Sequence, residues 1–256
     1  MHQFFRIANL WIALSPVFAF HFVANANGTA KKQLPEQKIN AEATAPLPGA
    51  GLSSETRNVL KTVSERYLKF RKWSAEFTQE NHSIGLGQGQ FFKGAFVFEF
   101  PNRFKYSLYS PEVVDYISDG KKFWQIQFRQ GREKAAHVRV FPDLKKVELD
   151  KYLFLLRGID TRDKKSEARL LKDFAVEGKI IEDELHVILE PRQSNEIVKM
   201  TLIFKQSAEA LYRAILEDAL GAKTIITLLS HKVLKKVPAD SFKAVYPSNS
   251  KVESIQ

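Results

Sequence analysis

Residues 96–108 read FVFEFPNRFKYSL, and this stretch decides the fold. Apolar and polar residues alternate on both sides of Pro101, which is typical of two β-strands joined by a turn. The same period of two runs through most of the chain from Trp73 onwards, and aromatic residues dominate one side of it. Aromatic residues are abundant, since the chain contains 20 Phe, 7 Tyr and 3 Trp. The sequence therefore predicts consecutive antiparallel strands, each with one strongly aromatic face.

Two segments show helical spacing instead. Residues 53–70 begin at Ser53 or Ser54, either of which can cap a helix, and then repeat apolar residues every three or four positions. Residues 148–157 follow the same spacing and end near Gly158. Both predicted helices are apolar on one side only, so each is expected to cover part of the sheet.

Glycine-containing turns punctuate the strand pattern. Asp119-Gly120 predicts a two-residue hairpin, and we expect further turns near Gly178 and Gly221. Residues 160–165 are charged and predict a loop. About ten short strands with two helices predict a mainly β (α+β) protein, built as one strongly curved antiparallel sheet or incomplete barrel. Helices that cover such a sheet loosely would form a lid over a hydrophobic cavity.

The first 26 residues have the pattern of an export signal. Arg6 precedes a mostly apolar run, and Ala24-Asn25-Ala26 supplies the small-x-small pattern of a signal-peptidase site. We therefore expect cleavage after Ala26 and a periplasmic location. Residues 27–51 are rich in Pro and Ala and predict a disordered linker, and the polar tail at 248–256 is expected to be flexible.

The amino-acid composition excludes several kinds of active site and metal site. The chain has no cysteine, which excludes a disulfide framework, a thiolate metal site, a cysteine nucleophile and a cysteine-linked lipid. The four histidines after the export signal never have ligand spacing, and no Gly-x-Ser-x-Gly elbow occurs. We therefore predict a protein that is not an enzyme and needs no cofactor or metal. The net charge of +10 on an exported chain favours anionic membranes or acidic proteins as partners, rather than nucleic acid.

The excess of Phe predicts an apolar ligand site. Such a site binds acyl chains by area, at about 0.8 kcal/mol for each buried methylene. Ordinary core packing is the alternative for any single residue. The residues expected to line the cavity or its lid are Phe96, Phe98, Phe100, Phe104, Tyr106, Leu108, Trp124, Ile126, Leu149, Leu153 and Leu156.

Residues 52–247 resemble the LolA-type periplasmic outer-membrane lipoprotein carrier family. The resemblance implies an unclosed antiparallel β-barrel with helices as a lid over a hydrophobic cavity, formed by a single domain over these residues. The motifs that carry it are Ala75-Glu76-Phe77-Thr78-Gln79, Gly89, Pro101-Asn102-Arg103-Phe104-Lys105-Tyr106, Ser110-Pro111 and Ile117-Ser118-Asp119-Gly120-Lys121-Lys122-Phe123-Trp124.

The resemblance also implies a function. A monomeric soluble carrier would take the acyl chains of lipidated proteins from an inner-membrane ATP-binding cassette exporter to the outer-membrane acceptor LolB, or to the membrane itself. The acceptor shares the fold but is a lipoprotein, and a chain without cysteine cannot be that acceptor. Two alternatives stay open: a similar carrier of another envelope lipid or glycolipid, and a lipid-sensing regulatory binding module. Such modules usually have a second domain, for which this chain has no room.

Phe100 departs from the family pattern. The family usually places a basic residue directly before the Pro of the Pro-x-x-Phe segment, and that residue is understood to hydrogen-bond the lid helices and favour closure. Phe100 cannot donate such bonds, and we expect it to add apolar area beside Phe96 and Phe98. Arg103 is a possible substitute for the missing base. We therefore expect Phe100→Arg to weaken the binding of an acylated ligand.

Overall fold

The computed structural model describes residues 52–68, 71–83, 89–144, 159, 161, 163–193, 197–207 and 210–255. The chain divides into two units, residues 1–51 and residues 52–256, and all the described residues belong to the second. The predicted export signal, the linker and the predicted helix at 148–157 lie outside the described residues. Within the described part, no helix has the length and hydropathy that a membrane span requires.

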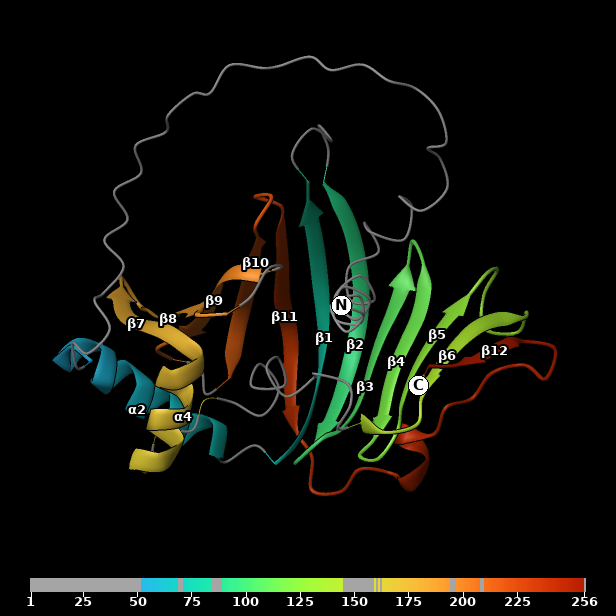
Figure 1. Cartoon of the computed structure of the whole chain (residues 1–256), viewed down its shortest axis with the longest axis horizontal. Coiled ribbons are helices and arrows are strands. Elements are labelled where there is room, and N and C mark those ends of the chain that lie inside the picture. The colour runs from blue at the N-terminus through green and yellow to red at the C-terminus, as the bar shows by residue number, and fades with distance from the viewer. Residues whose placement is uncertain are drawn as a thin grey trace, which may run out of the picture. The chain divides into compact units, whose positions relative to one another are not determined.

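Twelve strands of the described residues form one sheet that does not close (Figure 1). Its order is β12-β6-β5-β4-β3-β2-β1-β11-β10-β9-β8-β7. The strands are β1 (Lys72–His82), β2 (Gln90–Glu99), β3 (Arg103–Ser110), β4 (Val113–Asp119), β5 (Phe123–Phe128), β6 (Ala136–Phe141), β7 (Phe174–Ile181), β8 (Glu184–Pro191), β9 (Ile197–Lys205), β10 (Leu211–Asp218), β11 (Lys223–Val233) and β12 (Lys251–Ser254). The helices are α2 (Ser54–Leu68), α4 (Lys164–Asp173) and the 3-10 helix η4 (Ala239–Phe242). The prediction of an open, curved, mainly antiparallel sheet is confirmed.

The sheet consists of two meanders joined at one seam. Strands β1 to β6 pair in chain order, and so do β7 to β11. The seam is the antiparallel pair of β1 and β11, in which Phe77 lies opposite Leu228. At the far edge, β12 pairs with β6 in parallel. The seam therefore joins the first strand of the chain to its last long strand.

The register defines an inner and an outer face. Directly opposed residues of antiparallel neighbours point to the same side of a sheet, and Gly178 of β7 lies against helix α2. We call the side of Gly178 the inner face. Following the pairs from there gives Val187, Leu202, Ala214, Ile226, Gln79 and Phe92 as inner-face residues of successive strands.

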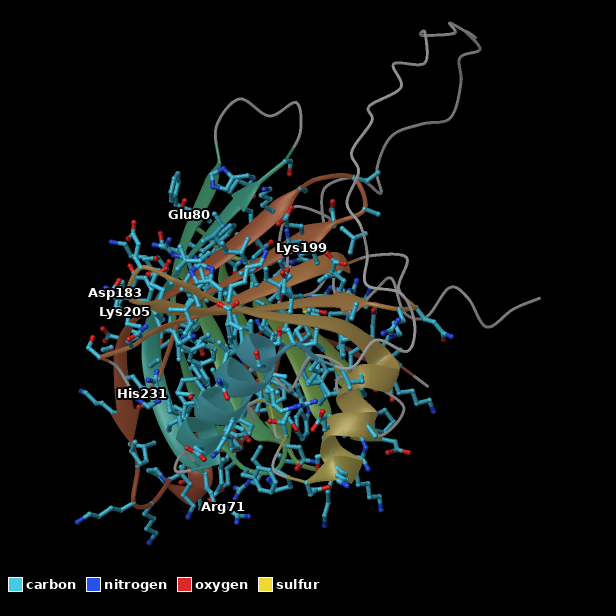
Figure 2. The ribbon with its side chains drawn as sticks, turned by 90° about the vertical axis from the view of Figure 1, so that its left-hand side faces the viewer. Arg71, Glu80, Asp183, Lys199, Lys205 and His231 are labelled. Carbon is cyan, nitrogen blue, oxygen red and sulfur yellow. The ribbon has the colours of Figure 1, made fainter. Side chains whose placement is uncertain are left out.

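In strands β1 to β4 the two faces of the sheet differ in their content of charged residues. Every Asp, Glu, Lys and Arg of β1 to β4 falls on the outer-face register. Figure 2 shows Glu80 and Lys205 toward the left-hand side of the ribbon and helix α4 on the right. The inner face of these strands is thus left to apolar and uncharged polar side chains.

Helix α2 is anchored on the second meander. Ser53 caps it, because its Oγ accepts a hydrogen bond from the Thr56 amide at 3.0 Å. The Thr56 hydroxyl accepts a bond from the Gly178 amide at 3.0 Å and donates to the Gly178 carbonyl at 3.4 Å. At the other end, Arg66 donates to the carbonyls of Lys205 and Gln206 at 3.0 Å each. The helix is therefore held at both ends, across β7 and the end of β9.

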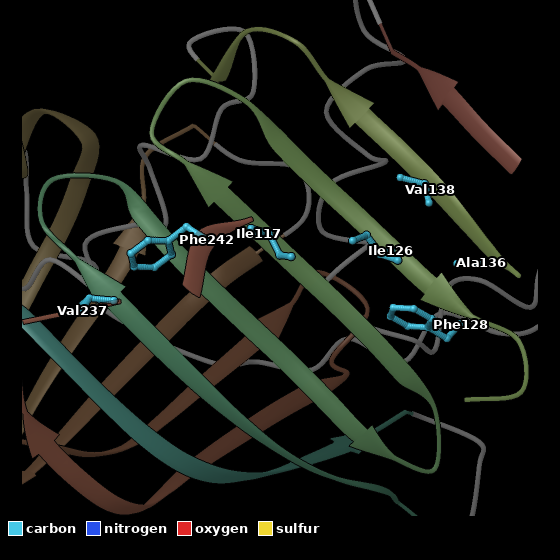
Figure 3. Close-up of a cluster of buried hydrophobic side chains, with 7 residues drawn as sticks. All are labelled: Ile117, Ile126, Phe128, Ala136, Val138, Val237 and Phe242. Atoms are coloured by element: carbon cyan, nitrogen blue, oxygen red, sulfur yellow. The ribbon is translucent and has the colours of Figure 1, made fainter. Parts of the chain in front are cut away.

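A second core lies on the outer face of β4 to β6. The segment that contains η4 supplies Val237 and Phe242 to this core and covers the apolar residues on the outer face of these strands. Arg103 closes one edge of the cluster, with its guanidinium 4.6 Å from the centre of the Phe242 ring. Figure 3 shows the members Ile117, Ile126, Phe128, Ala136, Val138, Val237 and Phe242.

The turn predictions are partly confirmed. Gly120 and Gly221 occupy turns with φ of +94° and +83°. The hairpin at Asp119 is longer than expected, since three residues separate β4 from β5 and the Asp119 carboxylate accepts bonds from the amides of Lys121 and Lys122.

Three local predictions are wrong. Gly178 lies in the middle of β7 rather than in a turn. A glycine is needed there because a Cβ would be too close to Thr56 and Val59 of helix α2. The loop expected at 160–165 extends too far, because Lys164 and Lys165 already belong to helix α4, for which Asp163 is the N-cap. The tail expected to be flexible contains β12, whose backbone pairs with β6.

Candidate functional site

Five of the predicted site residues meet on the inner face of β2 and β3. Phe96 pairs with Tyr106 and Phe98 with Phe104, while Leu108 pairs with Gly94. The side chains of Phe96, Phe98, Phe104 and Leu108 are each at most 4% exposed. The alternation in residues 96–108 therefore identified the centre of this surface correctly.

Aromatic contacts extend this centre across five strands. Trp73 lies edge-on to Phe96 at 4.1 Å between ring centroids, and Phe77 stacks on Tyr106 at 4.5 Å. The contacts continue from Tyr106 to Tyr116 at 6.1 Å and from Tyr116 to Phe123 at 6.5 Å. We call the following set the aromatic inner face: Trp73, Phe77, Phe92, Phe96, Phe98, Phe104, Tyr106, Leu108, Tyr116 and Phe123.

The sequence analysis omitted half of this set. Trp73, Phe77 and Tyr116 were visible as members of alternating strands, but nothing in their own strands shows which strands lie beside each other. The sequence does not distinguish Phe123 from Trp124 and Ile126 as the inner-face residue of its strand, because both alternating sets are apolar. The missing information is the register between strands.

Trp124 and Ile126 lie on the opposite face. Trp124 pairs with Ile117 and Ile126 with Asp115, both outer-face positions. Ile126 belongs to the second core and Trp124 packs against it. The prediction that these two residues share a surface with Tyr106 is therefore wrong, because β5 supplies apolar side chains to a core on each side of the sheet.

Phe100 is also separate from the aromatic inner face. Strand β2 ends at Glu99, and Phe100 lies in the following turn with 44% of its surface exposed. The Arg71 guanidinium lies 4.7 Å from the centre of its ring. The expectation that it adds apolar area beside Phe98 is wrong. Arg103 does not replace the family's basic residue on the inner face either, since it pairs with Glu99 at 2.6 Å on the outer face.

The predicted lid residues Leu149, Leu153 and Leu156 lie outside the described residues.

A polar group continues the inner face toward the end of β1. The Tyr106 hydroxyl donates to Gln79 Oε1 at 2.6 Å, and Gln79 Nε2 donates to Asn81 Oδ1 at 2.9 Å. Gln79 and Asn81 are 1% and 3% exposed. Burial, together with the nearby Tyr116, raises the pKa of Tyr106 well above its ordinary value, so its hydroxyl keeps its proton.

The inner face is less completely covered at the seam between the two meanders. Ile226 and Leu228 of β11 point to the inner face, opposite Gln79 and Phe77, and both are only partly buried. No group of three or more His, Asp or Glu that could hold a metal ion occurs among the residues described. What this surface offers is therefore apolar area with a few uncharged hydrogen-bonding groups.

A pocket of about 630 Å³ lies on the outer face, between β2 to β5 and residues 245–247. Its main polar feature is Asp115, which is 1% exposed and accepts a bidentate pair of bonds from Arg132. Burial alone would raise the pKa of Asp115, but the hydrogen bonds from Arg132 and Ser107 and the charge of Lys105 outweigh it and lower the pKa. The carboxylate of Asp115 is thus paired with two cations, Arg132 and Lys105, and the charged side chains that line the pocket leave one positive charge in excess.

Comparison with known proteins places the fold in a family. Residues 69–245 match the family model described as outer membrane lipoprotein carrier protein LolA. No curated protein sequence matches the chain.

Solved structures show distant similarity. An uncharacterized conserved protein from Thermus thermophilus has 11% identity and a TM-score of 0.46, covering 78% of this chain and 98% of its own. A LolA superfamily protein from Nitrosomonas europaea has 11% identity and a TM-score of 0.38, covering 75% and 99%. LprF from Mycobacterium bovis has 9% identity and a TM-score of 0.38, covering 74% and 98%. The assignment rests on the sequence match, which spans more than half of the residues: the chain belongs to the LolA family of outer membrane lipoprotein carrier proteins.

Proposed function

We propose that this chain is a carrier that holds acyl chains against its aromatic inner face. The observation that supports this most directly is the separation of the two faces, with every Asp, Glu, Lys and Arg of β1 to β4 on the outer register. Members of the family are binding or carrier proteins rather than enzymes. An uncharged, aromatic surface is suited to hydrocarbon.

The size of the apolar surface is sufficient for such a ligand. About ten buried methylenes contribute about 8 kcal/mol of binding free energy, before the cost of immobilising the ligand. The partly buried Ile226 and Leu228 give hydrocarbon a place to enter at the seam between the meanders. The same carrier can therefore load and release its cargo, provided that an acceptor offers comparable apolar area.

We further propose that the cargo is the acyl chains of lipoproteins, moved through the periplasm from the inner to the outer membrane. The partners would be an inner-membrane ATP-binding cassette exporter and either LolB or the outer membrane itself. This requires export, with cleavage after Ala26. Sequencing the N-terminus of the envelope form tests that step, and a chain that still begins at Met1 would contradict it.

The binding proposal is tested by displacement of an environment-sensitive apolar dye. The dye should bind the folded chain and be displaced by a synthetic diacylated peptide, but not by the same peptide without acyl chains. Leu228→Glu should weaken both interactions, because residue 228 points to the inner face. Leu229→Glu is the matched control, since Leu229 is 62% exposed at a bulge in the strand pairing. Equal effects of the two substitutions, or competition by the unacylated peptide, would contradict the proposal.

A further inference from the structure

Asn81 has a buried hydrogen-bond donor without a partner. It lies on the inner face, opposite Gln90 of β2 and Thr224 of β11, and it is 3% exposed. Its Oδ1 accepts the bond from Gln79, but its Nδ2 makes no hydrogen bond. A buried donor left unsatisfied destabilises the folded state. A position that retains this cost is a candidate for contact with a ligand.

The neighbouring bonds fix the orientation of this donor. Tyr106 donates to Gln79 Oε1, so the NH₂ group of Gln79 is directed at Asn81. That bond takes the oxygen of Asn81 and leaves its NH₂ group available. The NH₂ group of Asn81, the last in this series of hydrogen bonds, therefore needs an acceptor.

The inner face of β1 changes character along its length. Trp73, Ala75 and Phe77 are apolar, and Gln79 and Asn81 are polar. The apolar part spans about 13 Å, because residues of one face repeat about every 6.6 Å along a strand. An acyl ligand has the same asymmetry, with a hydrocarbon tail that ends in a carbonyl group.

We propose that Asn81 Nδ2 donates a hydrogen bond to the carbonyl oxygen of an acyl group whose tail lies along Phe77 and Trp73. This inference rests on the proposed function and adds a chemical preference to it. An ester- or amide-linked acyl chain supplies the missing acceptor, whereas an ether-linked alkyl chain of the same length has no carbonyl. The site therefore selects acyl over alkyl lipids.

The test compares ester and ether ligands on the full chain. The competitors of the apolar dye are a diacylglyceryl peptide, its dialkyl ether analogue, phosphatidylglycerol and the diether analogue of phosphatidylglycerol. The wild-type chain should bind the diacyl peptide roughly tenfold more tightly than the diether peptide. The two phosphatidylglycerol arms show whether the same preference extends to membrane phospholipid. A preference confined to the phospholipid pair would assign the carbonyl to phospholipid and overturn a lipoprotein source.

Substitutions at residue 81 locate the preference. Asn81→Leu should bind the ester and ether ligands equally and bind the ether ligand at least as tightly as wild type does, since it removes the unsatisfied donor. Asn81→Asp, which replaces the donor with an acceptor, should bind the diacyl peptide more weakly than wild type. Gln127→Leu is the control, because it removes an inner-face amide on β5 and should keep the preference.

Two results would overturn the inference: no ester preference in the wild type, or a preference that persists in Asn81→Leu. If neither the ester nor the ether ligand displaces the dye, the proposed function itself fails, and that outcome is distinct from both.

Discussion

Phe77 and Tyr106 stack with ring centroids 4.5 Å apart, although a whole strand lies between the strands that carry them. The contact is possible because the intervening residue of β2 is Gly94, which pairs with Phe77. A Cβ at this position would collide with the Phe77 ring and with the carbonyl oxygen of Ser107. The continuity of the aromatic inner face therefore depends on the absence of one methyl group.

Gly94→Ala should destabilise the folded state by about 1–3 kcal/mol, because the added methyl group overpacks a filled site. Urea unfolding measures the change. Gly131→Ala is the control: Gly131 has a φ of +88° and open space around its Cβ position, so it reports only the cost of a left-handed backbone. Loss of acyl-ligand binding in the Gly94 variant at normal stability would show that the stack serves binding and not folding.

Thr56→Val should loosen helix α2 from β7. Valine keeps the shape of threonine but leaves the amide and carbonyl of Gly178 without their partner, at a cost of about 1–3 kcal/mol. Hydrogen exchange of the α2 amides should speed up more than that of β1 to β4. The control Thr62→Val removes only a bond to the Asn58 carbonyl within the helix and should change little. Uniform acceleration over the whole sheet would contradict a local role.

Asp115 should contribute stability that depends on pH. Its folded-state pKa is lowered, so the unfolded chain binds the proton more tightly. The contribution is complete above the unfolded pKa of about 4 and is lost as the pH falls through the lower folded pKa. At pH 7, Asp115→Asn should cost about 1–3 kcal/mol in urea unfolding. The difference from wild type should shrink on acidification, and a difference that stays constant down to pH 2 would refute this account.

Arg132→Gln tests the same pair from the other side. It leaves the buried carboxylate with Lys105 at 3.5 Å as its remaining cation. Because the side chain of Arg132 is 40% exposed and that of Asp115 only 2%, losing the arginine should cost more than Asp115→Asn, about 3 kcal/mol. The reverse order would mean that the pocket is more hydrated than its geometry indicates.

Phe100→Arg should leave acyl-ligand affinity unchanged, contrary to the expectation from sequence. Phe100 is exposed in a turn, and its main contact is with Arg71. Losing a cation–π contact at an exposed site costs about 0.5–1 kcal/mol. Phe98→Arg, at a fully buried position two residues earlier, should instead prevent folding. Weaker ligand binding by Phe100→Arg at an unchanged melting temperature would restore a role for this residue in the lid.

Local patterns predicted the local structure. The period of two identified the strands, Ser53 marked the start of α2, and Asp119-Gly120 marked a hairpin. Alternation within residues 96–108 also placed five site residues on one surface. These predictions succeed because each depends on interactions between residues close together in the chain.

The predictions that failed concern residues whose contacts are far away in the sequence. Trp124 reads like a cavity residue because it is apolar in an alternating strand, but the segment around η4 covers its side of β5. Gly178 reads like a turn, but its role is to admit Thr56 and Val59 of a helix more than a hundred residues earlier. Gln79 and Asn81 occupy inner positions of a predicted strand, and two consecutive polar residues at such positions were the available signal for the polar group.

The seam between β1 and β11 sets the order in which the protein can be assembled. Phe77 and Leu228 face each other across it from positions about 150 residues apart, so this pairing carries the largest loop-closure entropy in the sheet. Each meander can form from hairpins between consecutive strands as the chain emerges. The pairing of β1 with β11 can form only after β11 has left the ribosome or crossed a membrane. Until then the aromatic surface of β1 has an open flank. A newly made chain therefore covers this flank of β1 only after nearly all of its length has been delivered.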